Sequence, residues 1–229
     1  MKSLVFDTGP IISFTTNNLL WLFSELKEKF KGDFYISEAT KRELVDKPLL
    51  TKKFKLEALQ VRKIIKQGVF DVVENEKLKK KTIELLDLAN NCFFAKKHPL
   101  NIAHYAEISD IAACILLGSD VMVIDERTTR LLVEDPMHIQ KILQRKLHTK
   151  VSVDKGKVEE FSSKVRKLKM IRSVELVTVA YELGLLNRYL AEDIENPKST
   201  LLESALWGVK LNGCSVSDEE IDKIIKMES

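Results

Sequence analysis

The sequence lacks any long uninterrupted hydrophobic run. No apolar stretch reaches the roughly 18 residues that a membrane-spanning helix needs, and the first residues do not show the cationic and apolar regions of a secretory signal. We therefore expect a cytoplasmic protein with no membrane partner. The chain of 229 residues is 45% hydrophobic and 31% charged, a composition typical of a folded protein with a substantial core.

Cysteine is also scarce. Cys92, Cys114 and Cys214 are far apart and form neither a CxxC pair nor a Cys/His ligand spacing, which excludes a disulfide framework and a structural zinc site. We expect three buried free thiols. The four histidines have no ligand spacing either, and we leave them out of catalysis: His98, His104, His138 and His148.

A glycine-rich phosphate-binding loop is absent, which disfavours nucleotide hydrolysis. The net charge of +3 is too small to indicate a nucleic-acid partner by itself. The sequence contains no internal repeat and no low-complexity segment. Evidence for function must therefore come from the pattern of apolar and acidic residues.

Strand-like and helix-like segments alternate along the first two thirds of the chain. The predicted strands are 3–6, 33–37, 69–74 and 120–125, and the predicted helices are 17–30, 38–46, 54–68, 77–97 and 103–118. Asn17 or Asn18 is expected to begin the first of these helices, Ser37 to cap the second, and Gly118 to end the last. This alternation predicts a parallel sheet flanked by helices.

The tail from about Val158 onward has an almost continuous helical pattern. We therefore expect a domain at 1–150 and a helical C-terminal extension at 151–229. A separate domain of that length would bury its apolar faces poorly, so the extension should pack on the sheet domain or on a second subunit. We expect a homodimer.

Acidic residues follow the first and the last predicted strands. Because the carboxyl ends of parallel strands meet at one edge of a sheet, Asp7 and Asp125 should lie near each other. Glu107 and Asp110 share one face of a helix, and Glu43 lies one and a half turns into another. Gly9 and Pro10, next to Asp7, favour a tight turn and a helix start that present Asp7 instead of burying it.

Clustered carboxylates repel one another and raise each other's pKa values unless a cation lies between them. A hard divalent ion, Mg²⁺ or Mn²⁺, removes that cost, takes oxygen ligands and supports phosphodiester hydrolysis. The sequence therefore predicts an oxygen-ligand metal site. Its expected ligands are Asp7, Glu107, Asp110 and Asp125.

Four motifs together resemble those of PIN-domain proteins, and more narrowly the larger archaeal-type members related to the toxin ribonucleases of toxin–antitoxin pairs. The motifs are DTGPII at Asp7, SEATKREL around Glu43, AEISDIAACILLG with Glu107 and Asp110, and VIDERTTRLL with Asp125. The segments RSVELVTVAYELGLL and GCSVSDEEIDKII look like the C-terminal part of the larger members. The third acid of the family is commonly Asp; here Glu107 has the matching spacing and Asp110 the matching residue type, so either can be the main third ligand.

This resemblance implies a three-layer α/β/α PIN-like fold and a metal-dependent ribonuclease. The implied catalytic residues are Asp7, Glu43, Glu107, Asp110 and Asp125. The implied partners are RNA, expected to be single-stranded, and an antitoxin protein. The insertion between Pro48 and Pro99 is longer than in the small toxin members, which weakens the toxin interpretation.

Several side chains have two interpretations. The candidates for holding substrate phosphates are Thr8, Arg127, Arg130, Arg172 and Ser173, although surface ion pairs would explain the arginines equally well. Thr8 and Ser13 can hydrogen-bond a carboxylate or only the local backbone. Glu126 fits the first turn of a helix better than a metal shell, and an acid such as Asp7 is often only a helix cap.

Three functional classes were compared. The first is a metal-dependent endoribonuclease that uses these carboxylates. The second is a non-catalytic RNA-binding or scaffolding protein of the same fold, which the complete set of acids disfavours. The third is a phosphotransferase of the haloacid dehalogenase type, which fails because Gly9 stands where that class needs a second Asp.

Overall fold

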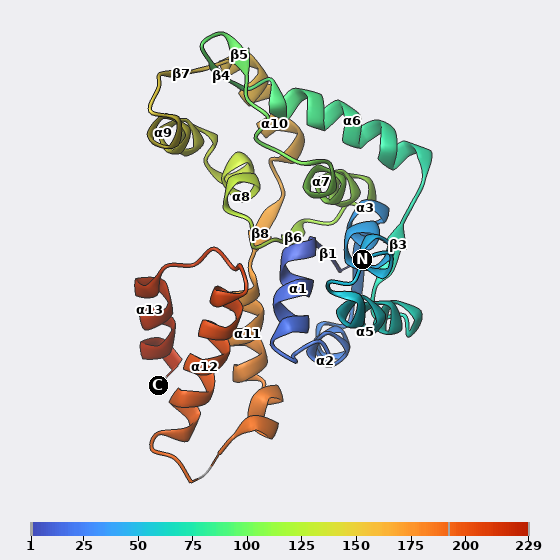
Figure 1. Cartoon of the computed structure of the whole chain (residues 1–229), viewed down its shortest axis with the longest axis vertical. Coiled ribbons are helices and arrows are strands. Elements are labelled where there is room, and N and C mark those ends of the chain that lie inside the picture. The colour runs from blue at the N-terminus through green and yellow to red at the C-terminus, as the bar shows by residue number, and fades with distance from the viewer. Residues whose placement is uncertain (1, 192, 229) are drawn as a thin grey trace.

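A computed structural model describes residues 2–191 and 193–228. Within that part of the chain, five parallel strands form a central sheet in the order β3-β2-β1-β6-β8 (Figure 1). Their bounds are β1 (Ser3–Phe6), β2 (Asp33–Ser37), β3 (Asp71–Val73), β6 (Val121–Val123) and β8 (Lys169–Ile171).

Helices cover both faces of this sheet. One face packs against α1 (Thr8–Thr16), α2 (Leu22–Phe30), α5 (Lys55–Lys66), α11 (Ser173–Glu182), η2 (Leu185–Tyr189), α12 (Pro197–Leu211) and α13 (Asp218–Glu228). The other packs against α6 (Glu76–Asn90), α7 (Tyr105–Leu117), α8 (Arg127–Glu134), α9 (Pro136–Leu147) and α10 (Lys155–Val165). The connection from β2 to α5 contains α3 (Glu38–Lys41), the π-helical turn η1 (Arg42–Asp46) and α4 (Lys47–Leu49).

The side chains of the central strands alternate between two hydrophobic cores. In β1, Leu4 and Phe6 lie in the core with α1 and α2, whereas Val5 lies in the core with α6 and α7. Successive side chains of a strand point to opposite faces, so a strand buried on both faces is apolar throughout. The predicted three-layer α/β/α fold with a parallel central sheet is confirmed.

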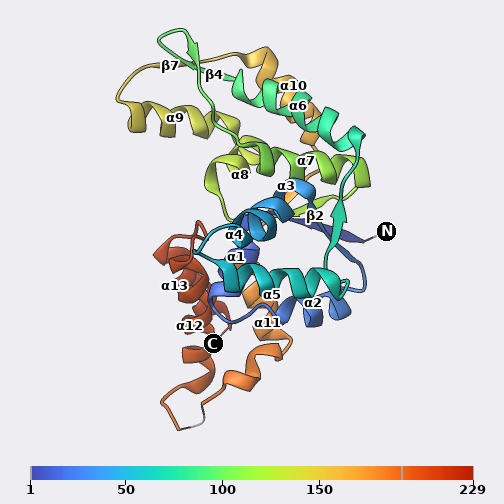
Figure 2. The same cartoon turned by 45° about the vertical axis from the view of Figure 1, so that its right-hand side comes forward.

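The C-terminal helices share the first core. Val177 of α11 and Leu206 of α12 belong to the same cluster as Phe14 of α1 and Phe23 of α2. Figure 2 shows α11 and α12 beside α1 and below the sheet. The apolar faces of the tail thus pack on the sheet domain, which is one of the two arrangements expected from the sequence.

Several short strands differ from the predicted pattern. The helical pattern at 77–97 ends as a helix at Asn90, and β4 (Phe93–Ala95) follows it. With β5 (His98–Pro99) and β7 (Val151–Val153), β4 forms a small antiparallel sheet. In the tail expected to be helical, β8 is an edge strand of the central sheet. A strand of three residues is too short to show an alternating pattern of apolar and polar side chains, so it could not be distinguished from the helical segments on either side.

The helix predicted at 17–30 begins later, at Leu22 (α2), and an additional helix, α1, precedes it. The chain turns directly from β1 into α1 at Thr8, with Asp7 as the N-cap, while Asn17 lies at the C-terminal end of α1. The caps predicted at Ser37 and Gly118 are confirmed: Ser37 Oγ accepts the N–H of Thr40, and Gly118 ends α7 with φ of 66°. The three cysteines are buried and unpaired, as predicted. In the described ranges, no helix is both long enough and apolar enough to cross a membrane.

Candidate functional site

The carboxyl ends of β1 and β6 form the candidate site. From β1 the sheet continues through β2 and β3 on one side and through β6 and β8 on the other, so the strand order reverses between β1 and β6. Ligands of open parallel sheets bind outside the strand ends at such a reversal. Asp7 follows β1 and Asp125 lies two residues beyond β6, and the Asp7 N–H donates to Val123 O at 2.9 Å.

Gly9 allows the two acids to approach each other. A Cβ atom at this position would lie 3.3 Å from Asp125 Cβ and 3.5 Å from Asp7 Oδ2. A contact of 3.3 Å is tighter than carbon atoms normally make. The missing side chain of Gly9 therefore leaves the room in which the start of α1 lies against the end of β6.

Asp7 is buried, with a relative exposure of 5%, contrary to the expectation that the turn would present it. The reason is that α1 begins at once and folds Asp7 back toward β6. Its Oδ2 accepts a hydrogen bond from the N–H of Gly9 at 3.2 Å, so Asp7 is the N-cap of α1, as the helix-cap interpretation predicts. Burial raises the pKa of Asp7 to about 7, the charges of Glu107 and Asp125 add to this, and the amides of Thr8 and Gly9 act against it.

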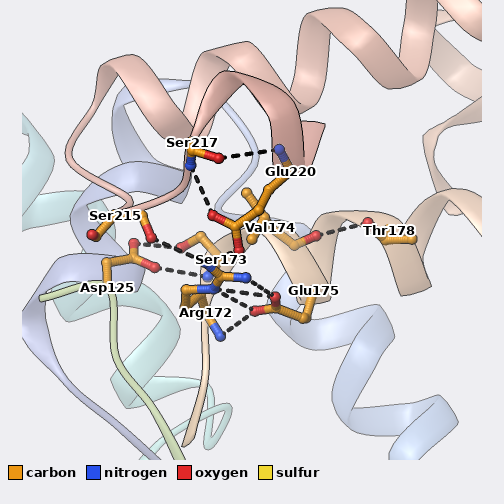
Figure 3. Close-up of polar contacts among 9 residues, drawn as sticks. All are labelled: Asp125, Arg172, Ser173, Val174, Glu175, Thr178, Ser215, Ser217 and Glu220. Carbon is orange, nitrogen blue, oxygen red and sulfur yellow. Dashed lines mark hydrogen bonds and ion pairs between the residues drawn. The ribbon is translucent and has the colours of Figure 1, made fainter. Parts of the chain in front are cut away.

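Asp125 is held by two serines from distant segments, of which Figure 3 draws Ser173. The Ser173 N–H donates to Oδ1 at 2.7 Å and the Ser173 hydroxyl to Oδ2 at 2.6 Å. The hydroxyl of Ser13 on α1 also donates to Oδ2, at 3.2 Å, and makes a 3.3 Å bond to Asn212 O. Of the two interpretations of Ser13, the bond to a carboxylate is confirmed, and its backbone partner is not local, because Asn212 lies 199 positions away. These donors fix the carboxylate plane of Asp125.

Asp110 on α7 is completely buried and faces the start of α3. The Ser37 N–H donates to Oδ1 at 3.0 Å and the Thr40 hydroxyl to Oδ2 at 2.6 Å. Burial, followed by the charge of Asp7, raises the pKa of Asp110 well above its usual range, although these two donors act against the shift. Asp110 thus joins α7 to the end of β2 and lies close enough to Asp7 to feel its charge.

Glu107, one turn before Asp110, is only partly buried. Its Oε2 accepts the His104 N–H at 3.1 Å and the Thr129 hydroxyl at 2.8 Å. Its Oε1 accepts no hydrogen bond from the described residues. Burial is the main cause of its raised pKa. Of the acids near Asp7, Glu107 has the oxygen that is freest for a ligand.

Glu43 lies at the exposed margin of this group. Its Oε2 accepts a long 3.5 Å bond from the Thr8 hydroxyl, and its Oε1 pairs with Lys47 at 3.4 Å. Thr8 thus links Glu43 to the start of α1. This places Glu43 and Thr8 at the rim of the acid cluster and not within it.

The arginines after β6 lie in different surroundings. Glu126 caps α8 by accepting the N–H groups of Thr128 and Thr129 at 2.8 and 2.6 Å, as expected for a residue at a helix start. Arg127 is exposed. Arg130 is partly buried, and its Nε is the buried side-chain nitrogen that has no hydrogen-bond partner among the described residues.

Arg172 and Ser173, the remaining substrate-binding candidates, are engaged within the protein. Arg172 pairs with Glu175 at 2.6 Å and with Glu220 at 3.1 Å, and Ser173 donates to Asp125. The pKa of Arg172 is raised: burial acts to lower it, but the two glutamates outweigh that effect. Ser173 therefore contacts the acid cluster directly, whereas Arg172 contacts Glu175, Glu220 and the backbone oxygen of Ser215.

The donor chemistry fits a hard divalent cation. Asp7, Glu107, Asp110 and Asp125 supply only oxygen, and within residues 2–191 and 193–228 no Lys or Arg forms an ion pair with any of them. Buried charges are normally paired or bound to metal. As the side chains lie, however, no group of three or more His, Cys, Asp or Glu residues in those ranges is arranged to hold an ion. The residue types suit a metal, while their present positions do not complete a coordination shell.

Comparison with known proteins gives no match for this chain. No family model matches it, and no curated protein or solved structure does. The family resemblance of the four motifs therefore stays a prediction.

Proposed function

We propose that the protein is a metal-dependent endoribonuclease of the PIN type. One observation carries the proposal: the buried Asp7 carboxylate lies at the reversal point of the sheet beside the charges of Glu107 and Asp125, and its pKa is raised to about 7. Retaining unpaired buried acids destabilises the fold. Such an arrangement is explained when a cation binds between them.

Asp7, Asp125 and Glu107 are the proposed ligands. Among the described residues, the hydrogen bonds to the Asp7 carboxylate come only from backbone amides. Asp7 contributes this carboxylate, and Glu107 contributes Oε1. Asp125 is held in orientation by Ser173 and Ser13, as ligating carboxylates commonly are. Asp110 accepts hydrogen bonds from Ser37 and Thr40 and so joins α7 to the end of β2 beside the site. It remains the alternative third ligand.

A bound Mg²⁺ or Mn²⁺ would polarise a phosphate oxygen of the substrate and make a water more acidic for hydrolysis. The chain's own residues fix where this happens. Asp7 and Asp125 set the position through the backbone of β1 and β6, and the surrounding core excludes bulk water from their inner side. A substrate must therefore approach from the open side, where Glu43 and Thr8 lie.

A groove of about 650 Å³ borders that open side. Its lining includes the acids Glu38 and Glu43. It also includes three cationic side chains and two aromatic rings, in that order Arg42, Lys47, Lys79, His104 and Tyr105. Cations bind the phosphates of a single strand and aromatic rings stack on its bases. This composition supports RNA as the substrate.

The test is cleavage of a fluorescent single-stranded RNA with Mn²⁺ and with EDTA. We expect cleavage only with the metal, a loss of at least 100-fold in Asp7→Asn and Asp125→Asn, and parental cleavage in Asp87→Asn, which changes an exposed acid on α6. Equal cleavage by the parent and both site variants would overturn the assignment. RNA binding without cleavage, with no Mn²⁺-dependent shift in melting temperature, would instead indicate a non-catalytic RNA-binding protein.

A further inference from the structure

The segment between α12 and α13 lies against the end of β6. The Ser215 N–H donates to the backbone oxygen of Asp125 at 3.1 Å, and the Ser13 hydroxyl that bonds to Asp125 also bonds to Asn212 O. The C-terminal part of the chain therefore contacts both the backbone and the side-chain environment of Asp125. This contact brings together residues about 90 positions apart in sequence.

Arg172 connects this segment to the start of α11 (Figure 3). Its Nη1 donates to Ser215 O at 3.0 Å and to Glu220 Oε1 at 3.1 Å. Its Nη2 and Nε donate to Glu175 at 2.6 and 3.1 Å. The side chain is only 10% exposed, so these bonds form in a largely dehydrated setting, in which charge-assisted bonds are stronger than on the surface.

The same residue sets the position of Ser173. The Arg172 N–H donates to Glu175 Oε2 at 2.6 Å, which caps the first turn of α11, and Ser173 is the first residue of that helix. Both Ser173 donors then bond to Asp125. A movement of the Arg172 guanidinium would be transmitted to the two donors that orient the Asp125 carboxylate.

We propose that Arg172 is a positioning residue for Asp125 and that Glu220 of α13 acts through it. Glu220 accepts a hydrogen bond from the guanidinium, which also bonds to Ser215 O and to Glu175 at the start of α11. Ser215 and Ser173 in turn donate to Asp125. The C-terminal helix thus supports the Asp125 carboxylate through Glu220 and Arg172 and supplies no ligand itself. This inference rests on the proposed function, because it takes Asp125 as a metal ligand.

The experiment measures the Mn²⁺ concentration at half saturation, here called the Mn²⁺ midpoint. It is obtained from the shift in melting temperature and, separately, from the rate of RNA cleavage. Glu220→Gln removes one of the two ion pairs of Arg172. It does not leave an unpaired buried cation, because the ion pair with Glu175 remains. Its matched control is Glu219→Gln, an exposed neighbour on α13 that is not among the ion-pair and hydrogen-bond partners of Arg172 in the described part of the chain. Arg172→Lys is the second variant, because it keeps the charge but loses the fork that bridges the two glutamates.

We expect Glu220→Gln and Arg172→Lys to raise the Mn²⁺ midpoint about 10-fold, because substitutions of residues that orient a metal ligand commonly weaken metal affinity by this factor or more. Cleavage at saturating Mn²⁺ should stay within a few-fold of the parent, and Glu219→Gln should match the parent throughout. A lower melting temperature with an unchanged Mn²⁺ midpoint in both variants would show a purely structural role and overturn this inference alone. A parent with neither a Mn²⁺ shift nor cleavage would overturn the proposed function, and this inference with it.

Discussion

Ser173 donates a hydrogen bond to each carboxylate oxygen of Asp125, one from its backbone N–H and one from its hydroxyl. The two residues are 48 positions apart, and the pair joins the end of β6 to the first residue of α11. Short bonds to an ionised acceptor are about twice as strong as neutral ones. The tail of the chain therefore helps to build the acid cluster and is not an appendage to it.

Ser173→Ala removes the shorter of these bonds and keeps the backbone donor. We expect a loss of about 1–2 kcal/mol in the free energy of unfolding, since a buried acceptor loses a charge-assisted partner. Ser13→Ala removes the longer 3.2 Å bond to the same oxygen and should cost less. Urea denaturation of both variants measures this order. A larger loss in Ser13→Ala would show that the Ser173 hydroxyl does not dominate the support of Asp125.

The edge of the sheet at which the acids meet could be predicted, because it depends on local patterns. The apolar runs before Asp7 and Asp125 identify two parallel strands, and parallel strands place their ends together. The side chains that support the acids could not be predicted in the same way. Thr40 bonds to Asp110 across 70 residues, and Glu220 bonds to Arg172 across 48, and neither partner has a sequence pattern of its own. Arg172 forms ion pairs, one of the two interpretations that the sequence left open, but a buried arginine and an exposed one have the same sequence signal, so its burial could not be predicted.

The buried Asp7 should make stability depend on pH. The native state keeps the Asp7 proton up to about pH 7, whereas the unfolded chain releases it near the ordinary value of 3.8. Because the native state binds more protons in that window, the free energy of unfolding should fall as the pH rises from about 4 to about 7. The raised pKa of Asp110 gives a contribution of the same sign.

Asp7→Asn isolates the Asp7 contribution. Without metal, this variant should gain stability over the parent as the pH rises, from little at pH 4 to a few kcal/mol, in order of magnitude, at pH 8. Mn²⁺ at pH 8 should stabilise the parent and leave Asp7→Asn nearly unchanged. Denaturation at four pH values, with the exposed Asp87→Asn as control, measures the difference. A constant difference between parent and Asp7→Asn across that range would contradict the raised pKa.

The third ligand can be identified by comparing Glu107→Gln with Asp110→Asn. The amide of Glu107→Gln still accepts the bonds from His104 and Thr129 through its oxygen, so stability should change little while the Mn²⁺ midpoint rises at least 10-fold. In Asp110→Asn the amide has one acceptor oxygen for the two buried donors of Ser37 and Thr40. At pH 4, where ionisation of the buried acids contributes little, we therefore expect a loss of about 1–3 kcal/mol in the free energy of unfolding.

The Mn²⁺ midpoint, measured by calorimetry, decides between the two acids. A smaller shift for Asp110→Asn than for Glu107→Gln is expected, because Glu107 is partly exposed and its Oε1 accepts no hydrogen bond from the described residues. The reverse order would make Asp110 the ligand and Glu107 a supporting residue.

Gly9→Ala tests whether the close approach of α1 to β6 matters for function apart from stability. The added Cβ would lie 3.3 Å from Asp125 Cβ, so the two acids would have to separate by a few tenths of an ångström. Alanine favours a helix over glycine by up to about 1 kcal/mol, which offsets the strain of that separation. We expect a melting temperature within roughly 3 °C of the parent, because 1 kcal/mol corresponds to only a few degrees in a chain of this size.

Gly156→Ala is the matched control, since Gly156 is likewise the second residue of a helix that begins after an aspartate cap. Its added Cβ would meet only Asp154 Oδ1, at an ordinary 3.5 Å, and Asp154 lies outside the acid cluster. Gly156→Ala should therefore keep the parental Mn²⁺ midpoint, whereas Gly9→Ala should raise it several-fold and slow RNA cleavage to match. Thermal melts over a Mn²⁺ series measure both variants. If Gly9→Ala also keeps the parental Mn²⁺ midpoint, the affinity for Mn²⁺ does not depend on the spacing between Asp7 and Asp125. The metal must then be bound by other ligands in the cluster.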